Sequence, residues 1–544
     1  MHRQGVIFAA LALLFTLLMS LPWLVPHMGW TALAGLVPLL VMERLASEYK
    51  VRRFFWWHYG SFVLWNAVTT WWVGGATVGG AVFAILANAL QMSLVFGSFR
   101  WVKKRLGGVL PYIYLAAAWI AWERFYLTSA QISWPWLVLG NAFADTSSLV
   151  QWYSVTGHLG GSLWVWCANL GLFGGMVALS DGRPARWNWK ARAAAFSGIA
   201  VALFGPMLWS ACLRFEEEGP ALEVIIGQPN LDPYQKFESL SQEQQDARFL
   251  AQLEKASWPS DSTLVLVMGP ETLTPSLFTD AVPENASFQR YQSFLQAHPG
   301  ARLLFGASSY DRSVSYAAPN PCSYDLGAQP DGRHLWYTAH NTAILMDGAG
   351  RYDLYHKCKL VVGVESTPYP KVFIPLENLL GGNLMGKDVG QKEISCLSLP
   401  AGNDAPEGAS PPVGAAVCYE SVYGEFCTGY VRKGAKLLTV ITNDAWWGNT
   451  PGYKQHLNYS RLRAIETRRW VARCGNTGIS AIIDPRGRIL QRTPWWEASL
   501  LQGQVQLLEG QSFFVRYGDM VGRLAVFLFL LLGAAALLRR FKNR

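Results

Sequence analysis

Eight apolar stretches constrain this chain more than any other feature of its sequence. Each is long enough, or nearly so, to cross about 30 Å of hydrocarbon as a helix that rises about 1.5 Å per residue. Only 15% of the residues are charged, against about 25% in an average soluble chain. The sequence therefore predicts a membrane protein whose spans lie at 5–24, 28–43, 54–76, 79–99, 109–127, 159–180, 192–213 and 519–537.

Lys and Arg residues gather in alternate connections between these stretches. They occur before the first stretch, in 43–53, 100–105 and 181–192, and after the last, whereas 25–27, 77–78 and 128–158 contain none. Because basic connections stay on the cytoplasmic side, we expect both termini in the cytoplasm and the segment 214–518 outside. The formal net charge of +9 then reflects orientation in the membrane, and we expect no nucleic-acid partner.

The connection 128–158 is rich in Trp, Leu and Val although it lies between two spans. We interpret it as an aromatic belt at the membrane surface, with the rim of a lipid site as the alternative. Glu123 and Arg124 lie near the outer end of their span, and no ionisable residue lies in the middle of any span. The spans are therefore expected to form a scaffold and not an ion path.

Between 214 and 518 the sequence changes to short apolar runs separated by Gly, Pro, Asn and Asp. Strands alternating with helices predict an α/β domain. Expected strands are 222–227, 263–268, 302–306, 342–346, 413–417, 437–442, 479–483 and 488–491, and expected helices are 242–256, 286–297, 421–433 and 455–473.

Three residues capable of chemistry follow apolar strands of this domain: Glu271, Lys357 and Cys418. Ligand sites in α/β sheets gather at the carboxyl ends of strands. A carboxylate that accepts the thiol proton, an ammonium that stabilises negative charge, and a thiol that carries an acyl group together suit acyl transfer.

Other interpretations of these residues remain open on spacing alone. A Cys that ends a buried strand is commonly a small core residue, and Cys358 and Cys427 are rival nucleophiles. His340 and His456 would suit a Cys–His arrangement, but neither has a supporting motif. The pairing of the Cys residues in the outer domain, if any, does not follow from the sequence.

Four sequence blocks follow one another along the outer domain: Gly269-Pro270-Glu271, Tyr355-His-Lys-Cys-Lys-Leu-Val361, Val417-Cys418-Tyr419-Glu420 and Thr442-Asn-Asp-Ala-Trp-Trp-Gly448. Shorter pieces accompany them: Trp134-Pro-Trp-Leu137, Gln455-His456, Arg463-Ala-Ile-Glu466 and Asn476-Thr-Gly478. In their order and spacing, these blocks resemble the apolipoprotein N-acyltransferase family, whose members are membrane proteins of the nitrilase superfamily.

The resemblance implies a fold and a set of roles. It implies an eight-helix membrane domain with an extracytoplasmic αββα nitrilase-like domain between spans seven and eight, so that the parts are 1–213, 214–518 and 519–544. Glu271 would be the general base, Lys357 the stabiliser of thiolate and oxyanion, and Cys418 the nucleophile. Supporting or substrate-binding residues would be Glu365, Tyr419, Glu420 and Trp446.

The resemblance also implies the reaction and its partners. A fatty acyl chain would pass from a phospholipid to Cys418 as a thioester, and then to the α-amine of a diacylglyceryl-modified N-terminal Cys of an apolipoprotein. We expect no metal and no cofactor, a monomer, and a place in the bacterial inner membrane with the catalytic domain in the periplasm.

Two alternatives use the same sequence differently. A membrane-tethered amidase would use the same three residues with water as the acceptor. A transporter or receptor would carry an inert nitrilase-like domain. The run Val362-Gly-Val-Glu365 also departs from the family's usual sequence after the lysine block, which leaves the acyl-chain preference and the role of Glu365 open.

Overall fold

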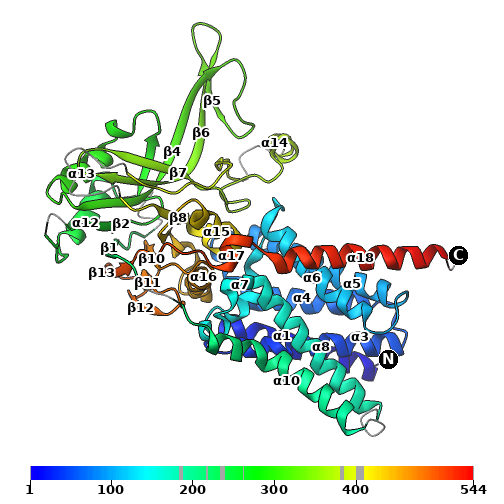
Figure 1. Ribbon diagram of the computed structural model, residues 1–544. Coiled ribbons are helices and arrows are strands. Elements are labelled where there is room, and N and C mark those ends of the chain that lie inside the picture. The colour runs from blue at the N-terminus through cyan, green and yellow to red at the C-terminus, as the bar shows by residue number, and fades with distance from the viewer. Residues whose placement is uncertain are drawn as a thin grey trace.

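The structure, a computed structural model, consists of a bundle of long helices and an α/β part at one end of that bundle (Figure 1). It describes residues 2–182, 188–215, 218–232, 239–260, 263–379, 385–399 and 410–542. The basic residues Arg183, Arg186 and Arg544, which contribute to the charge pattern, lie outside the described residues.

The bundle contains all eight predicted apolar stretches. Within the described residues, six helical segments are long and apolar enough to cross a membrane: Gln4–Leu24, Gly29–Glu48, Val78–Lys103, His158–Ser180, Trp189–Cys212 and Met520–Arg540. The stretches 54–76 and 109–127 form α4 and α6, which pack against α5. The bundle helices are α1 (His2–Leu24), α2 (Ala32–Gly35), α3 (Val37–Glu48), α4 (Phe54–Thr70), α5 (Val78–Lys103), α6 (Leu110–Thr128), α8 (His158–Ser180), α10 (Trp189–Cys212) and α18 (Met520–Lys542).

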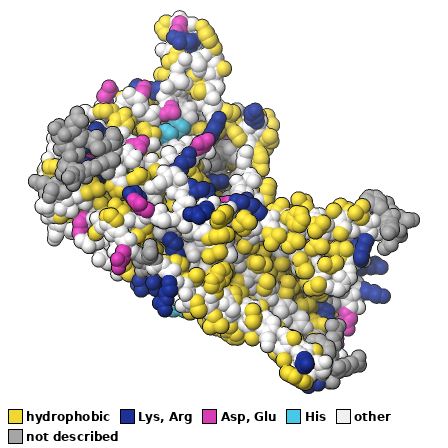
Figure 2. Space-filling model, in the orientation of Figure 1, with side chains coloured by type: hydrophobic (Ala, Val, Ile, Leu, Met, Phe, Trp, Pro, Cys, Tyr) yellow, Lys and Arg dark blue, Asp and Glu magenta, His cyan; other side chains and the backbone are white. Residues whose placement is uncertain are grey.

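Apolar side chains cover the outside of the bundle (Figure 2). Large ones are more than half exposed on α10, such as Phe196 and Leu208, and on α18, such as Phe527 and Leu530. A contiguous apolar surface of this kind is unstable in water and suits contact with lipid. These helices therefore form a membrane domain.

The connection 128–158 folds into short helical turns and does not face lipid. Trp136, Leu137, Trp152 and Tyr153 are buried. The indole of Trp136 donates a hydrogen bond to Oε1 of Gln455 in the α/β part at 2.6 Å. The belt interpretation is therefore wrong for these side chains, which form the contact between the two parts. The turns are η3 (Pro135–Leu137), η4 (Leu139–Phe143), η5 (Ser147–Val150) and α7 (Tyr153–Thr156).

Two β-sheets form the centre of the α/β part. The larger has the order β13-β1-β2-β4-β6-β5, with β3 paired to β4 and β7 to β6, and the smaller has the order β12-β11-β10-β9-β8. The strands of the larger sheet are β1 (Ala221–Gln228), β2 (Val265–Met268), β3 (Thr274–Phe278), β4 (Ala301–Ser315), β5 (Tyr324–Ala328), β6 (His334–Asp347), β7 (Tyr352–His356) and β13 (Ser499–Gln506). Those of the smaller sheet are β8 (Val413–Val417), β9 (Leu437–Thr442), β10 (Val471–Gly475), β11 (Ala481–Ile483) and β12 (Ile489–Arg492).

The predicted αββα layering is confirmed. One apolar core joins the two sheets, with Val224 and Met268 from the larger sheet and Ala415 and Val440 from the smaller. A second core lies between the larger sheet and helices α12 and α13, and α15 and α16 pack on the smaller sheet. The helices are α12 (Gln242–Leu253), α13 (Ala286–Gln296), α14 (Pro370–Leu379), α15 (Gly424–Arg432), α16 (Pro451–Thr467) and α17 (Phe513–Tyr517).

The predicted helix 455–473 is wrong in its last third. Helix α16 ends at Thr467, and Arg468 turns the chain with a φ of 52°. Val471–Gly475 is instead the central strand β10, buried between β9 and β11. Likewise the predicted helix 421–433 begins only at Gly424, after a 3-10 turn over Cys418–Val422. The apolar residues of a short segment fit both the helical and the strand period. Pairing with neighbouring strands therefore decides which of the two structures forms.

A buried ion pair fastens α16 to the start of α8. Oε1 of Glu466 accepts a hydrogen bond from the backbone N–H of His158 at 2.9 Å and from Nη2 of Arg463 at 2.9 Å. Arg463 Nε also lies 2.7 Å from Oε2 of Glu466, and both side chains are at most 1% exposed. The motif Arg463-Ala-Ile-Glu466 therefore joins the α/β and helical parts.

We predict that Glu466→Ala destabilises the protein by about 3–5 kcal/mol, because it leaves the Arg463 charge buried without its partner. Thermal unfolding of the detergent-solubilised protein measures the change. Glu509→Ala is the control, since Glu509 is 76% exposed in its pair with Lys436, and surface changes stay within about 0.5 kcal/mol. Equal unfolding temperatures for the two variants would contradict this role of Glu466.

Candidate active site

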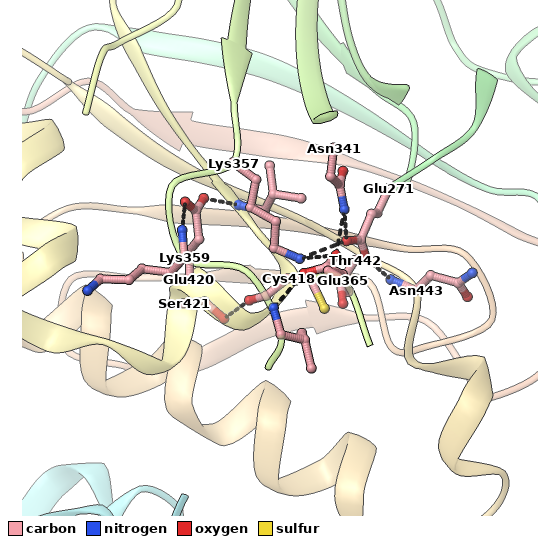
Figure 3. Close-up of polar contacts among 12 residues, drawn as sticks. Glu271, Asn341, Lys357, Lys359, Glu365, Cys418, Glu420, Ser421, Thr442 and Asn443 are labelled. Atoms are coloured by element: carbon pink, nitrogen blue, oxygen red, sulfur yellow. Dashed lines mark hydrogen bonds and ion pairs between the residues drawn. The ribbon is translucent and has the colours of Figure 1, made fainter. Parts of the chain in front are cut away.

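The structure brings Glu271, Lys357 and Cys418 together from the ends of three strands (Figure 3). Glu271 follows β2, Lys357 follows β7, and Cys418 follows β8. Gly306 on β4 permits the close approach of Glu271, because a Cβ at residue 306 would lie 2.6 Å from Cα of Glu271. The two sheets thus converge on one point, as the strand pattern predicts.

Lys357 is buried between two carboxylates. Its Nζ lies 3.2 Å from Oε1 of Glu271 and 2.7 Å from Oε1 of Glu365. Nδ2 of Asn341 donates hydrogen bonds to the same two oxygens at 2.8 and 2.9 Å. Burial alone would lower the pKa of Lys357, but the charges of Glu271 and Glu365 outweigh it and raise that pKa well above its usual value. The ammonium therefore stays charged.

Cys418 lies beside this ion cluster at a strained turn. Its φ is 51°, a left-handed conformation that non-glycine residues rarely adopt and that commonly marks functional sites. Burial, followed by the charge of Glu271, raises the pKa of the Cys418 thiol well above its usual value, while Lys357 acts in the opposite direction. The resting thiol is therefore protonated near neutral pH, and its reaction requires a base.

Glu420 holds the nucleophile turn against the lysine loop. Its Oε1 accepts hydrogen bonds from the backbone N–H of Cys358 at 2.6 Å and from the hydroxyl of Tyr355 at 2.7 Å. Its Oε2 accepts from the N–H of Val417 at 2.8 Å and from the hydroxyl of Tyr430 at 3.1 Å. Glu420 thus positions the segments on both sides of the site without facing the cavity.

A cavity of about 410 Å³ opens from Cys418 along the junction with the helical part. Its size lies in the usual range for ligand pockets, about 300–1,000 Å³. The catalytic part supplies Cys418, Tyr419, Trp447 and His456 to its wall. The helical part supplies Val73, Ala76, Thr77, Gly79, Gly80, Phe83, Ala84, Ala87, Tyr126, Ile132, Ser133, Trp134 and Trp136. The alternative interpretation of segment 128–158, the rim of an apolar site, therefore agrees with the structure.

The remaining predicted site residues take different positions. Glu365 contacts Lys357, and Tyr419 lines the cavity, where its hydroxyl donates to the carbonyl of Ser133 at 3.2 Å. Trp446 is 40% exposed and is not part of the cavity wall, whereas its neighbour Trp447 is. The structure therefore places Trp447, and not Trp446, in the wall of this cavity.

The rival cysteines lie outside the cavity. Burial raises the pKa of the Cys358 thiol to about 12 and also raises that of Cys427, as it does for Cys418. What distinguishes the rivals from Cys418 is therefore their position, because neither lines the cavity. All eight thiols are free in the structure.

Sequence reasoning missed two asparagines of the site. Asn341 bridges both carboxylates, although the predicted strand began one residue later, at Thr342. The backbone N–H of Asn443 donates to Oε2 of Glu271 at 3.0 Å. The signal was available, because Asn443 lies in the block from Thr442 to Gly448 that carries the resemblance.

Cys418, Asp444 and His456 place one possible metal-ligand atom each within 4.8 Å of one another. These groups already have partners, since Asp444 contacts Nδ1 of His456 at 2.8 Å and Nη2 of Arg473 at 2.7 Å. Burial disfavours the charge of Asp444, but His456 and Arg473 outweigh burial and lower its pKa to about 2. We therefore interpret the group as a buried support beneath Cys418.

Comparison with known proteins identifies relatives over most of the chain. Residues 239–513 match the model of the carbon-nitrogen hydrolase family, and residues 15–171 match that of the apolipoprotein N-acyltransferase N-terminal domain. The apolipoprotein N-acyltransferase of Chlorobaculum tepidum is 28% identical over 506 residues, which are 92% of this chain and 90% of that protein. Its counterpart from Geobacter metallireducens is 30% identical over 425 residues, 76% of this chain and 71% of that protein. That from Azotobacter vinelandii is 29% identical over 530 residues, 93% and 91% of the two chains.

The fold and the cluster around Cys418 thus define a membrane-bound member of the carbon-nitrogen hydrolase, or nitrilase, superfamily. Within it, the chain belongs to the apolipoprotein N-acyltransferase family, and it is an enzyme of the acyltransferase class.

We predict that Glu420→Gln destabilises the protein by about 1–3 kcal/mol. The carboxylate accepts hydrogen bonds from buried N–H and O–H groups, and the NH₂ of an amide in its place would leave some of these donors without an acceptor. Tyr430→Phe removes one of the bonds to Glu420, together with the contacts of the Tyr430 hydroxyl with Tyr355 and Ala415, but leaves the carboxylate and its other donors in place. It should cost about 0.5–1.5 kcal/mol. Chemical or thermal unfolding in detergent gives both values. A Glu420→Gln variant as stable as Tyr430→Phe would show that Glu420 does not hold the two segments together.

Proposed function

We propose that this chain transfers a fatty acyl chain from a phospholipid, through a thioester on Cys418, to the α-amine of the N-terminal diacylglyceryl-cysteine of an apolipoprotein. The observation that carries the proposal is the cavity, which joins Cys418 to the outer end of α5. There Val78, Val82 and Phe83 are each more than half exposed, so a lipid chain can enter sideways from the bilayer. The names of the family's relatives agree with this substrate class.

The first half-reaction follows from the charges around Cys418. Glu271 accepts the thiol proton as sulfur attacks the ester carbonyl of the lipid. The ammonium of Lys357 stabilises the negative charge on the carbonyl oxygen. When the intermediate collapses, the ester C–O bond breaks, Glu271 returns the proton to the departing glycerol oxygen, and a lysophospholipid leaves.

The second half-reaction uses the same groups in the same roles. The α-amine of the acceptor attacks the thioester carbon, Glu271 accepts its proton, and Lys357 again stabilises the oxyanion. The C–S bond then breaks, the proton goes to the departing sulfur, and an N-acyl lipoprotein leaves. The apolar walls of the cavity keep water from the thioester between the two steps.

We further propose the placement of the chain in the membrane. All eight apolar stretches would span the inner membrane of a bacterium, since α4 and α6 pack among the six long apolar helices. Basic side chains at the end of the bundle remote from the α/β part (Figure 2) support cytoplasmic termini and a periplasmic catalytic domain. The division into 1–213, 214–518 and 519–544, and action as a monomer, belong to the same proposal.

The alternative of a membrane-tethered amidase has less support. It uses the same three residues, but hydrolysis of a small amide requires neither an apolar cavity shared with the membrane helices nor protection from water. An amidase would release acid from a soluble amide and would form no stable adduct with phospholipid.

We predict that incubation with a phospholipid labelled in its sn-1 chain adds one acyl group to the full-length protein in detergent, as measured by intact mass. Hydroxylamine should remove the group, and a diacylated lipopeptide with a free α-amine should discharge it. Cys418→Ser should lose the hydroxylamine-sensitive adduct, and Lys357→Met should slow its formation by about 10²-fold or more.

The control is a lipopeptide with a blocked α-amine, which should leave the adduct intact. A wild-type protein without the adduct, or a Cys418→Ser variant with an undiminished hydroxylamine-sensitive one, would exclude Cys418 as the acyl carrier. Release of the labelled acid into water at the rate of acyl transfer would favour the hydrolase.

We also predict that Gly79→Phe slows acylation by long-chain donors by about tenfold or more, with a smaller effect on short-chain donors. Gly79 lies in the cavity wall, and a Cβ there would meet no atom within 4 Å, so the ring fills the cavity without disturbing the fold. Gly97→Phe on the same helix is the matched control, because a Cβ there also has open space but Gly97 lies outside the cavity wall. Equal rates for both variants with every donor would place the acyl chain elsewhere.

A further inference from the structure

Three side chains with metal-ligand chemistry meet behind the active site. They are Asp311 on β4, His340 on β6 and His356 at the end of β7, and one possible ligand atom from each lies within 4.8 Å of the others. Successive side chains of a strand point to opposite faces of a sheet. His340 therefore lies on the face opposite to its neighbour Asn341, which contacts Glu271 and Glu365.

The distance between two of these groups suits a bound ion. Nε2 of His340 lies 3.3 Å from Oδ2 of Asp311. Two ligand atoms at about 2.0–2.2 Å from a tetrahedral zinc ion are separated by about 3.3–3.5 Å. The rings of His340 and His356 lie 4.2 Å apart with an angle of 25° between their planes, so both imidazoles border the same space.

His340 directs a buried nitrogen toward Asp311. Its side chain is 7% exposed, and its Nε2 faces Oδ2 of Asp311 without the geometry of a hydrogen bond. Its Nδ1 lies 2.5 Å from the carbonyl oxygen of Val389, and a carbonyl can only accept, so Nδ1 carries a proton. Without a metal, a second ring proton on Nε2 would pair with the Asp311 carboxylate. A cation between the two groups would take the place of that proton.

The surrounding bonds are those that orient metal ligands. Histidine ligands usually direct their other ring nitrogen to a carbonyl or another polar group, which fixes the ring. Val389 does so for His340, and the hydroxyl of Thr342 lies 2.7 Å from Nδ1 of His356. The hydroxyl of Thr279 donates to Oδ1 of Asp311 at 2.5 Å, which leaves Oδ2 toward His340.

We propose that Asp311, His340 and His356 bind one divalent transition-metal ion of the Zn²⁺ class. Two imidazole nitrogens and one carboxylate oxygen suit such an ion, and water can complete the coordination because the Asp311 side chain is 49% exposed. The ion does not contact substrate. It joins β4, β6 and β7. Asn341 follows His340 on β6, and Lys357 follows His356 at the end of β7.

The ion would also fasten the segment beside Glu365. The N–H of Val389 donates to the carbonyl of Ala339 at 2.8 Å, and the N–H of Asp388 donates to the carbonyl of Glu365 at 2.8 Å. The segment that binds Nδ1 of His340 therefore also contacts a carboxylate partner of Lys357. Metal binding would stabilise the active site from the opposite face of the sheet.

The test uses the full-length protein in detergent, stripped of metal with a chelator and then titrated with Zn²⁺ or Co²⁺. We expect wild type to bind one equivalent more than Asp311→Asn, His340→Gln or His356→Gln, to unfold at a higher temperature with Zn²⁺, and to give visible Co²⁺ absorption that the variants lack. Thr342→Val should weaken binding by about 10- to 100-fold. Asp311→Asn alters a half-exposed side chain, so it keeps the test decisive if a histidine variant fails to fold.

The matched control is His334→Gln. His334 also contacts an aspartate, with Nδ1 2.9 Å from Asp325, but it belongs to neither metal-ligand group. This variant should bind metal as wild type does. Equal stoichiometry and affinity in wild type and Asp311→Asn, or a wild type without bound metal, would overturn the proposal.

Discussion

The ammonium of Lys357 between Glu271 and Glu365 is the interaction on which the rest of the active site depends. A charge buried without partners is strongly unfavourable, whereas a well-bonded ion pair in the same place is tolerated. Lys357 therefore requires both carboxylates, and they in turn require Asn341, the N–H of Asn443 and that of Val361, which donates to Oε2 of Glu365 at 2.7 Å. These donors come from β6 and from loops that follow strands of both sheets, so the fold itself assembles the cluster.

This charge balance also determines how the nucleophile works. A lysine without carboxylate partners would favour a permanent thiolate, but here two carboxylates neutralise it. The thiol of Cys418 stays protonated until a substrate carbonyl is in place. A resting thiol of this kind is less prone to oxidation than a thiolate.

The second constraint is the contact between the α/β part and the helices. Trp23 donates from its indole to the hydroxyl of Tyr459 at 3.0 Å, and Gln455 donates to the carbonyl of Trp23 at 3.1 Å. These bonds fasten α16 to α1, while Trp136 packs against Tyr459 of α16. Because the cavity has walls from both parts, neither part could form it alone, and the binding of a lipid chain that we propose would take place at their junction.

The sequence predicted the helices and strands whose local patterns are strong. It missed those features that depend on pairing or contact with other parts of the fold. Long apolar stretches predicted the membrane helices, and alternating strands and helices predicted an α/β domain. The αββα layering came from the family resemblance that the blocks around Glu271, Lys357 and Cys418 carry. Strand β10 was assigned to a helix because only pairing with β9 and β11 distinguishes the two periods. Asn341 was overlooked because its contact with the two carboxylates depends on the register of β6 within the sheet, which no local pattern encodes. Which of Trp446 and Trp447 faces the cavity depends on the tertiary position of their 3-10 turn.

At the left-handed turn of Cys418, the conformational stability of the backbone and the presence of a reactive side chain are in conflict. Glycine would adopt a φ of 51° without steric penalty, so the backbone would relax if residue 418 carried no side chain at all. Replacing the buried charges around Lys357 by apolar side chains of similar volume would also tend to increase the free energy of unfolding. Selection for stability alone would therefore favour glycine at residue 418. The cysteine that we propose as the nucleophile stands at a position where its backbone conformation costs free energy.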